Sequence, residues 1–363
     1  MGFMRTGIKF KKISVLAGIM LSVPALCMSL YGCGQAAAGS DSLTKIMETS
    51  TIFAMDTVME LQVYGDAALL TEAEQKIRSL ENAVSVTKED SDIGILNKEK
   101  TSIFSEETAE LMDRALSICE RTEGALDISI YPVVKAWGFT TGEYAVPSEK
   151  DLDALLENVD YTKIVFENDS IGAVCNIPDG MQIDLGSVAK GYTSSMIYDY
   201  FKDNGIESGL INLGGNVQCI GTKPNGDSWK VAIKSPFMDS ASGIFGVLKA
   251  ADVAVITSGG YERYFEQDGE IYWHIIDPEN GKPADNGLVS VTIVGKDGCL
   301  CDGLSTALFV MGLDEAVDFW QKSDDFDAIF IAEDGSAYIT EGIADSFTLS
   351  SEYYDTEITV IHR

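Results

Sequence analysis

His274 is the strongest candidate for a catalytic group in this chain. The 363 residues include two histidines, and His274 lies in the segment YWHIIDPENG, shortly before an Asp-Pro turn at Asp277 and Pro278. An imidazole has an unperturbed pKa of about 6.5, which suits proton transfer near neutral pH. A histidine at the end of a strand can also do no more than hydrogen-bond a neighbour. The residues around His274 leave both interpretations open.

Asp302 and Thr306 form a second candidate pair. They are spaced i, i+4 at the start of a predicted helix, so their oxygens face the same way. One carboxylate, one hydroxyl and a main-chain carbonyl make a set of hard oxygen ligands that Mg²⁺ accepts, with substrate phosphates completing the shell. The alternative is that Asp302 caps the helix N-terminus and binds no metal.

The segment IDLGSVAKGY at 183–192 predicts a strand that ends at Asp184, a turn at Gly186 and a helix from about Ser187. A helix N-terminus offers free N–H groups and the positive end of a dipole, which favour phosphate, and Lys190 adds a charge one turn later. Neither GxxxxGK[ST] nor GxGxxG occurs, so neither common nucleotide-binding fingerprint applies. A plain strand-turn-helix connection remains the alternative.

Two further segments carry weaker signals. The glycines of NLGGN, Gly214 and Gly215, lie between two apolar runs and suit either a close backbone approach or an ordinary hairpin turn. Asp127 precedes an aromatic-rich stretch that contains Trp137. Trp137 suits either the core or stacking on a planar ring.

The elements that must position these residues predict an α+β fold, with mixed or antiparallel sheets and packed helices. A strand is expected at 51–65, and helices at 67–84, 105–123, from Ser148, at 187–203 and at 303–322. Between them lie short β-rich runs without regular βα alternation, at 163–167, 173–177, 209–213, 217–221, 229–234, 244–248, 253–257, 271–277 and 288–294. We interpret 51–345 as one two-lobed catalytic domain and 346–363 as a C-terminal extension.

The composition limits the classes of partner. A formal net charge of −31 argues against nucleic acid or an anionic lipid surface as a ligand, and any bound anion needs help from a cation. Five cysteines lie beyond the first 33 residues, and their odd number and spacing favour buried small side chains over a disulfide framework or a metal site.

The N-terminus predicts export. Basic residues between Arg5 and Lys12 precede an uncharged apolar run at 13–31, which ends in Leu-Tyr-Gly-Cys at Cys33. This pattern resembles a bacterial lipobox, so we expect residues 1–32 to be a lipoprotein signal peptide, Cys33 to be acylated and 33–50 to be a flexible tether. The alternative is a transmembrane anchor, because the run is nearly long enough to span a bilayer. The lipoprotein interpretation predicts an extracytoplasmic protein anchored to the membrane by lipid.

Nine motifs in order resemble the FAD:protein FMN transferases, the ApbE-type flavin transferases. They are MDT, SxxGxLN, GALD, W-G-F, IDLGSVAKGY, NLGGN, TSGGYER, HIIDPxxG and CDGLSTA, and they cover about residues 52–345. The chain departs from the family pattern at Asp56, Leu126, Asn280 and Gly303, and none of these changes removes a group with chemistry.

The resemblance implies transfer of the FMN part of FAD to a Thr or Ser hydroxyl of an acceptor flavoprotein, with release of AMP. It implies Mg²⁺ ligands at Ser187 (main-chain oxygen), Asp302 and Thr306, and His274 as the catalytic histidine. It also implies FAD contacts at Met55, Ala125, Leu126, Asp127, Asp184 and Lys190. Acceptors of the Rnf or Nqr type, or extracellular reductases, are expected. Two alternatives stay open, a Mg²⁺-dependent FAD pyrophosphatase and a non-catalytic FAD-binding lipoprotein.

Overall fold

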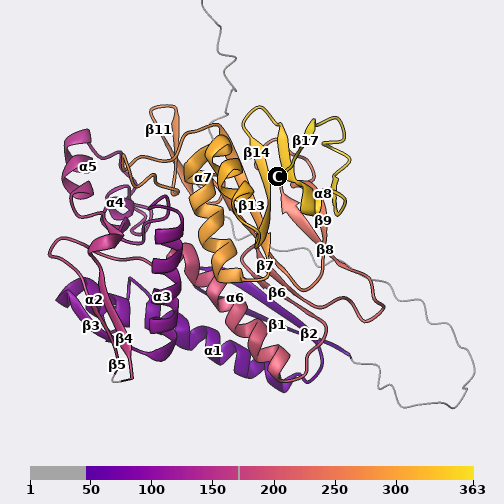
Figure 1. Cartoon of the computed structure of the whole chain (residues 1–363), viewed down its shortest axis with the longest axis horizontal. Helices are drawn as coiled ribbons and strands as arrows, with labels where there is room; N and C mark the ends of the chain where they lie inside the picture. Colours follow the sequence, from indigo (N-terminus) through magenta and orange to yellow (C-terminus); the bar gives the residue numbers. More distant parts are fainter. Residues whose placement is uncertain (1–45, 171) are drawn as a thin grey trace, which may run out of the picture. The chain divides into compact units, whose positions relative to one another are not determined.

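A nine-stranded sheet forms the centre of the fold (Figure 1). The computed structural model describes residues 46–170 and 172–363, and residues 45–363 belong to one unit. All neighbouring strands of this sheet are antiparallel except the last pair, which is parallel. Their spatial order is β1 (Met47–Ala54), β2 (Thr57–Tyr64), β6 (Gly209–Leu213), β7 (Asn216–Ile220), β10 (Ala254–Gly259), β13 (Leu288–Gly295), β14 (Phe326–Ala332), β15 (Ala337–Thr340) and β17 (Ile358–Ile361).

The two faces of this sheet bury different partners, because successive side chains of a strand point to opposite faces. In β14, Ala328 and Phe330 pack with α7 (Gly298–Gln321), whereas Ile329 and Ile331 pack with a second, three-stranded sheet. That sheet consists of β16 (Phe347–Leu349), β9 (Ile244–Ala250) and β8 (Trp229–Lys234). Helices therefore cover one face and strands cover part of the other.

Three helices lie on the helical face: α1 (Ala68–Val84), α6 (Gly186–Asp203) and α7. Helices α6 and α7 pack closely because two glycines meet. A Cβ on Gly191 of α6 would lie 2.1 Å from the carbonyl oxygen of Gly298 in α7. This contact brings the segments that carry the predicted site residues side by side.

Further elements form two more clusters, of which the larger packs against α6 and α7. The larger cluster contains α2 (Asp92–Glu99), α3 (Glu106–Arg121), and the small sheet of β3 (Thr101–Phe104), β5 (Gly172–Asn176) and β4 (Val165–Asp169). The smaller one contains α4 (Tyr131–Ala136), α5 (Glu149–Leu156), and the hairpin of β11 (Tyr264–Gln267) and β12 (Glu270–Trp273). The α+β class with largely antiparallel sheets is thus confirmed.

Three expected elements differ from the structure. The single strand expected at 51–65 is a hairpin, because Met55 and Asp56 adopt φ values of 47° and 58° and form a tight turn between β1 and β2. Helix α7 begins at Gly298 rather than 303, and it breaks at Gly312. The strand expected to end at Asp184 is reduced to one isolated bridge, between Ile130 and Gln182.

The chain end is built into the fold. Residues 346–363, which the sequence suggests as an extension, contribute β16 to the three-stranded sheet and β17 to the nine-stranded sheet. The signal peptide, Cys33 and residues 33–45 of the expected tether lie outside the described residues, and the last part of that tether is wrong because β1 already begins at Met47. Within 46–170 and 172–363, none of the helices is both long and apolar enough to cross a bilayer.

The five cysteines of the described part are unpaired and buried, as expected. They are Cys119, Cys175, Cys219, Cys299 and Cys301. Burial raises the pKa of each thiol, to about 12 for Cys119, Cys175, Cys219 and Cys299. These side chains are therefore neutral thiols at neutral pH and pack as small hydrophobic groups.

Candidate functional site

Asp302 lies inside α7 and joins three elements. Its side chain is 4% exposed, and its two oxygens accept hydrogen bonds from the main-chain N–H of Gly191 (2.7 Å) and the amide of Asn216 (2.9 Å). The helix cap is Asp297, which accepts a hydrogen bond from the Leu300 N–H, so the interpretation of Asp302 as an N-cap is wrong. Burial raises the pKa of Asp302, while the charge of Lys190 and these two bonds act against that rise.

The Asp302 carboxylate and the Ser187 carbonyl lie beside the same N–H. In helical geometry the carbonyl of Ser187 faces the N–H of Gly191, four residues later, and that N–H donates to Asp302. Thr306, one turn after Asp302, has its hydroxyl 3.2 Å from the hydroxyl of Ser258 in β10. The three predicted metal ligands are therefore hard oxygens on two packed helices.

This donor set fits a single Mg²⁺ that keeps water or phosphate ligands. Each oxygen of Asp302 accepts one hydrogen bond, so each keeps one lone-pair direction for a cation. A cation would also stabilise the buried carboxylate in its charged form. Across residues 46–170 and 172–363, no three acidic, histidine or cysteine side chains gather as a metal cage. Mg²⁺ commonly binds through one or two carboxylates and substrate phosphates rather than in such a cage.

His274 lies at the open end of the β11–β12 hairpin, directly after β12. Its main-chain N–H and its Nδ1 are 3.1 Å and 3.2 Å from the carbonyl oxygen of Arg263. A carbonyl only accepts, so Nδ1 carries the proton in this bond and Nε2 keeps its lone pair. Burial, together with the charges of Arg263 and Lys190, lowers the pKa of His274 to about 4. The imidazole is therefore neutral at neutral pH, as a general base must be.

The predicted turn after His274 is present. The Asp277 carboxylate accepts hydrogen bonds from the Glu279 N–H (2.9 Å) and the Asn280 amide (2.5 Å). The indole N–H of Trp137 donates to the carbonyl of Gly281 in the same turn (2.8 Å). Trp137 is 2% exposed, so the core interpretation holds and ring stacking on a ligand is excluded for it. Trp137 instead fixes the turn that follows the histidine.

Asp184 connects the start of α6 to the loop that precedes α4. Its carboxylate accepts from the Gly186 N–H (2.8 Å), and its own N–H donates to the Ile128 carbonyl (2.9 Å). Burial raises the pKa of Asp184, and the charges of Arg263 and Lys190 act in the opposite direction. The segment that carries the predicted flavin contacts Ala125, Leu126 and Asp127 is thus held beside the α6 N-terminus.

Asp127 is occupied by its own loop. One of its oxygens accepts from the N–H (2.8 Å) and the hydroxyl (2.6 Å) of Ser129, and the other accepts from the Tyr161 N–H (3.0 Å). Its side chain is 6% exposed, and burial raises its pKa. These bonds shape the loop, so the segment's main chain and the neighbouring Ala125 are better placed to meet a ligand than the Asp127 carboxylate.

Met55, Ala125 and Leu126 pack into the same core cluster as α6. The Thr193 hydroxyl of α6 lies 3.7 Å from the Met55 sulfur, and the Met55 N–H donates to Glu81 (2.7 Å). The tip of the β1–β2 hairpin is thereby tied to α6.

Lys190 interacts electrostatically with several of the predicted site residues. Its charge acts on Asp184, Asp302 and His274, which come from different segments. The structure therefore brings the predicted residues into one region. It adds Arg263, Asn216 and Ser258, which sequence reasoning did not single out, although Arg263 ends the TSGGYER motif and Asn216 ends NLGGN.

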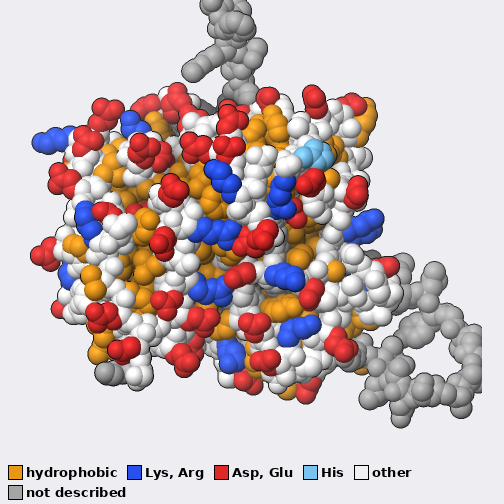
Figure 2. All heavy atoms as spheres, in the orientation of Figure 1, with side chains coloured by type: hydrophobic (Ala, Val, Ile, Leu, Met, Phe, Trp, Pro, Cys, Tyr) orange, Lys and Arg blue, Asp and Glu red, His pale blue; other side chains and the backbone are white. Residues whose placement is uncertain are grey.

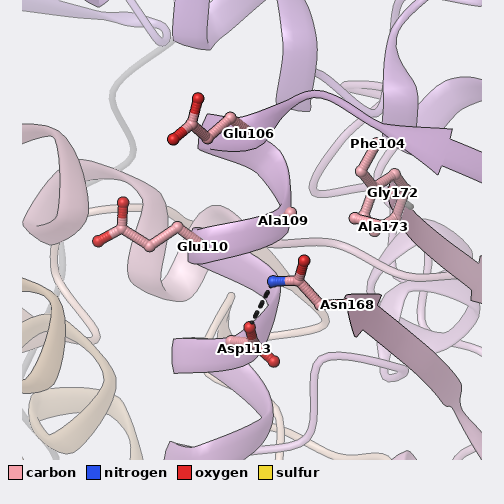
Figure 3. A pocket seen from close by; sticks show the side chains of 8 residues that line it. All are labelled: Phe104, Glu106, Ala109, Glu110, Asp113, Asn168, Gly172 and Ala173. Carbon is pink, nitrogen blue, oxygen red and sulfur yellow. Dashed lines mark hydrogen bonds between the residues drawn. The ribbon is translucent and has the colours of Figure 1, made fainter. Parts of the chain in front are cut away.

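A hollow of about 460 Å³ lies elsewhere, between α3 and the β3–β5–β4 sheet (Figure 3). Glu106, Glu110 and Asp113 of α3 line one side, and Asn168 crosses to Asp113 with a 2.9 Å hydrogen bond. None of the predicted site residues lines it. Its three carboxylates also make it unsuited to a diphosphate, so we place the functional site at α6 and α7 instead.

Known proteins of similar sequence and fold show which family the chain belongs to. An FAD:protein FMN transferase of Vibrio cholerae is 32% identical over 267 residues, which cover 72% of this chain and 79% of the relative. One of Treponema pallidum is 32% identical over 294 residues, covering 77% and 81%. The ApbE protein of Thermotoga maritima superposes with a TM-score of 0.75 at 30% identity, covering 82% of this chain and 98% of that structure. Residues 55–330 match the profile of the ApbE family, and the chain belongs to this family.

Proposed function

We propose that this protein transfers the FMN part of FAD to a Thr or Ser hydroxyl of an acceptor flavoprotein. The hydroxyl oxygen forms a bond to the FMN phosphorus, the bond between that phosphorus and the bridging oxygen breaks, and AMP leaves. FMN is then joined to the acceptor through a phosphodiester. Relatives named FAD:protein FMN transferase support this reaction.

The proposal is based on one observation: an amine, a carboxylate and an imidazole from separate elements lie in one region. The charge of Lys190 in α6 acts on both Asp302 in α7 and His274 after β12, although the three come from separate elements. Phosphoryl transfer needs charge neutralisation, positioning and a base for the attacking hydroxyl. These residues can supply all three.

Each residue has a distinct task in this reaction. His274, neutral and with Nε2 free, takes the proton of the acceptor hydroxyl. Lys190 attracts the diphosphate electrostatically, and the 125–128 segment and Met55 meet the flavin end. Asp302, Thr306 and the Ser187 carbonyl would hold Mg²⁺, which when bound neutralises diphosphate charge as a Lewis acid.

The proposal extends to the location of the protein. Acylation at Cys33 would hold the catalytic unit at the outer face of the cell membrane, close to membrane-bound acceptors. The LYGC sequence after an uncharged run supports this step. An acceptor of the Rnf or Nqr type, or an extracellular reductase, fits such a location.

One assay separates the proposed activity from its alternatives. The protein is incubated with FAD, Mg²⁺ and an isolated acceptor flavoprotein domain. A transferase makes the acceptor covalently fluorescent in a denaturing gel and releases AMP in equal amount. Free FMN and AMP with an unlabelled acceptor would identify a pyrophosphatase, and unchanged FAD would identify a binding protein.

A further inference from the structure

Arg263 is unusual among the arginines of residues 46–170 and 172–363, because nothing in the fold engages its guanidinium. Arg114 and Arg121 form salt bridges with aspartates, Arg78 donates to a carbonyl, and Arg363 lies over the ring of Trp320. The exposed guanidinium of Arg263 has no hydrogen bond, salt bridge or aromatic partner within this part of the chain.

An arginine without a carboxylate partner is unexpected in a protein with so many acidic residues. The chain has 57 acidic and 26 basic residues, and acidic side chains are spread over the face shown in Figure 2. A carboxylate partner would be easy to provide in such a protein. An arginine kept free of one is available to an anion that arrives from solution.

Arg263 is also fixed beside the catalytic machinery. Tyr264 and Trp273 are paired across the β11–β12 hairpin, so Arg263 and His274 are the next facing pair at its open end. The Arg263 carbonyl holds both the main chain and the ring of His274. The Arg263 charge also acts on His274 and on Asp184 at the start of α6. Its main chain and side chain therefore face the same site.

The site has room for one more positive charge. Asp184, Asp302 and the diphosphate of FAD together carry four negative charges. Lys190 and a bound Mg²⁺ would supply three positive charges, and Lys190 presents only a point charge. A guanidinium presents parallel N–H groups that match two oxygens of a phosphate.

We propose that the guanidinium of Arg263 binds the diphosphate of FAD and holds it next to His274. This assignment rests on the proposed function in that FAD is the ligand. Because the free side chain is exposed and unpaired, it forms these bonds without first breaking a salt bridge. The same hairpin end then holds both the base and the diphosphate that the acceptor hydroxyl attacks.

The test compares binding of FAD with binding of riboflavin, which has no phosphate. Arg263→Gln, Arg263→Lys and the wild-type protein are titrated with each ligand by flavin fluorescence, without acceptor, at several salt concentrations. Charge-assisted hydrogen bonds of this kind should make the FAD dissociation constant of Arg263→Gln rise by about tenfold or more. Riboflavin affinity should not change, and Arg263→Lys should lie between the two.

Lys230→Gln is the matched control, because it removes one positive charge from an exposed residue of β8. It should leave FAD affinity unchanged, and its salt dependence should match that of the wild type. The salt dependence of Arg263→Gln should be shallower, because one phosphate contact is lost. Equal FAD affinity in Arg263→Gln and wild type, or an equal loss for riboflavin, would overturn the assignment.

The binding measurement is independent of turnover. Wild-type protein that binds FAD through Arg263 but never labels an acceptor would overturn the proposed function and leave the Arg263 assignment standing. Efficient labelling by the wild-type protein, combined with unchanged FAD affinity in Arg263→Gln, would support the proposed function and overturn the Arg263 assignment. Wild-type protein that does not bind FAD would overturn both.

Discussion

The carboxylate of Asp302 accepts a hydrogen bond from the main-chain N–H of Gly191 at 2.7 Å. This bond crosses from α7 to α6 at the point where the helices approach most closely through glycine. It couples the packing of the two helices to the position of the one carboxylate in the proposed metal site. Stability and activity should therefore respond together to changes at this contact.

Gly191→Ala should weaken both the fold and the reaction. A Cβ there would lie 2.1 Å from the Gly298 carbonyl oxygen and 2.5 Å from the Asp302 Cβ, so the helices must separate. Overpacking of this kind costs about 1–3 kcal/mol. Urea unfolding should show that loss, and flavin transfer at fixed Mg²⁺ should fall with it.

Gly303→Ala provides the matched comparison on α7. Its Cβ would meet only side-chain atoms, the nearest being Ile118 Cγ2 at 2.9 Å, and these can shift. Alanine also gains helix propensity of about 1 kcal/mol over glycine. The stability of Gly303→Ala should stay within about 1 kcal/mol of the wild type. If both variants unfold alike, helix separation is not the cause.

Asp302→Asn should abolish turnover even at high Mg²⁺. It removes the only carboxylate of the proposed ligand set, and we expect a loss of at least about 100-fold. It should also lower stability by about 1–3 kcal/mol, because the amide cannot accept from both Gly191 and Asn216 at this buried position. Turnover is measured as AMP release across a Mg²⁺ titration.

Asn216→Ala separates the metal role from the structural one. It removes the 2.9 Å hydrogen bond to Asp302 but keeps the carboxylate, so excess Mg²⁺ should restore its activity. Thr306→Ala, which loses a neutral ligand, should be rescued in part. Near-normal turnover of Asp302→Asn at low Mg²⁺ would place the metal elsewhere.

Cys33→Ala should release the protein from the membrane fraction or leave it with an unprocessed signal peptide. The wild-type protein should begin at an acylated Cys33, and mass spectrometry of its N-terminal peptide detects this directly. Two acyl chains anchor far more firmly than one. An uncleaved N-terminus and identical membrane retention in both proteins would instead identify a transmembrane anchor.

Local patterns predicted most elements well. The strands at 209–213 and 229–234 coincide with β6 and β8, because alternation of apolar and polar residues shows directly which face is buried. The hairpin at Met55 and Asp56 was missed, because Met55 is not a typical residue for a left-handed turn and no Asn-Gly or Asp-Gly pair marks the position. Strand β14, sequence FDAIFIA, is buried on both faces and so lacks the alternation that marks a strand.

The sequence predicted which residues form the site, but not the hydrogen bonds that join them. The motifs point to His274, Asp302 and Lys190. That Asp302 is bonded to Gly191 and Asn216 depends on how α6, β7 and α7 pack, and no local pattern encodes those distances. The isolation of Arg263 is likewise a property of the folded surface, because it consists in the absence of neighbours within the described residues.

His274→Asn should retain FAD binding. Its single-turnover rate of FMN transfer at saturating FAD should fall by about 10²–10⁴-fold. Asparagine keeps a polar group of similar length without a proton-accepting nitrogen in the operating pH range. His362→Asn is the control, because His362 is the other histidine and its ring bonds to Glu341 at the chain end. A normal single-turnover rate for His274→Asn would remove the catalytic role.

The pH dependence gives an independent check on His274. Burial and two cations lower its pKa to about 4, so the base stays deprotonated across neutral pH and kcat/KM should fall only as pH drops towards 4. The fold must lose stability in the same direction, from about pH 6.5 down to about 4, because the unfolded chain binds the proton first. Circular dichroism at each pH separates unfolding from loss of the base. A break in kcat/KM near 6.5 with the fold intact would contradict the placement of His274 beside Arg263 and Lys190.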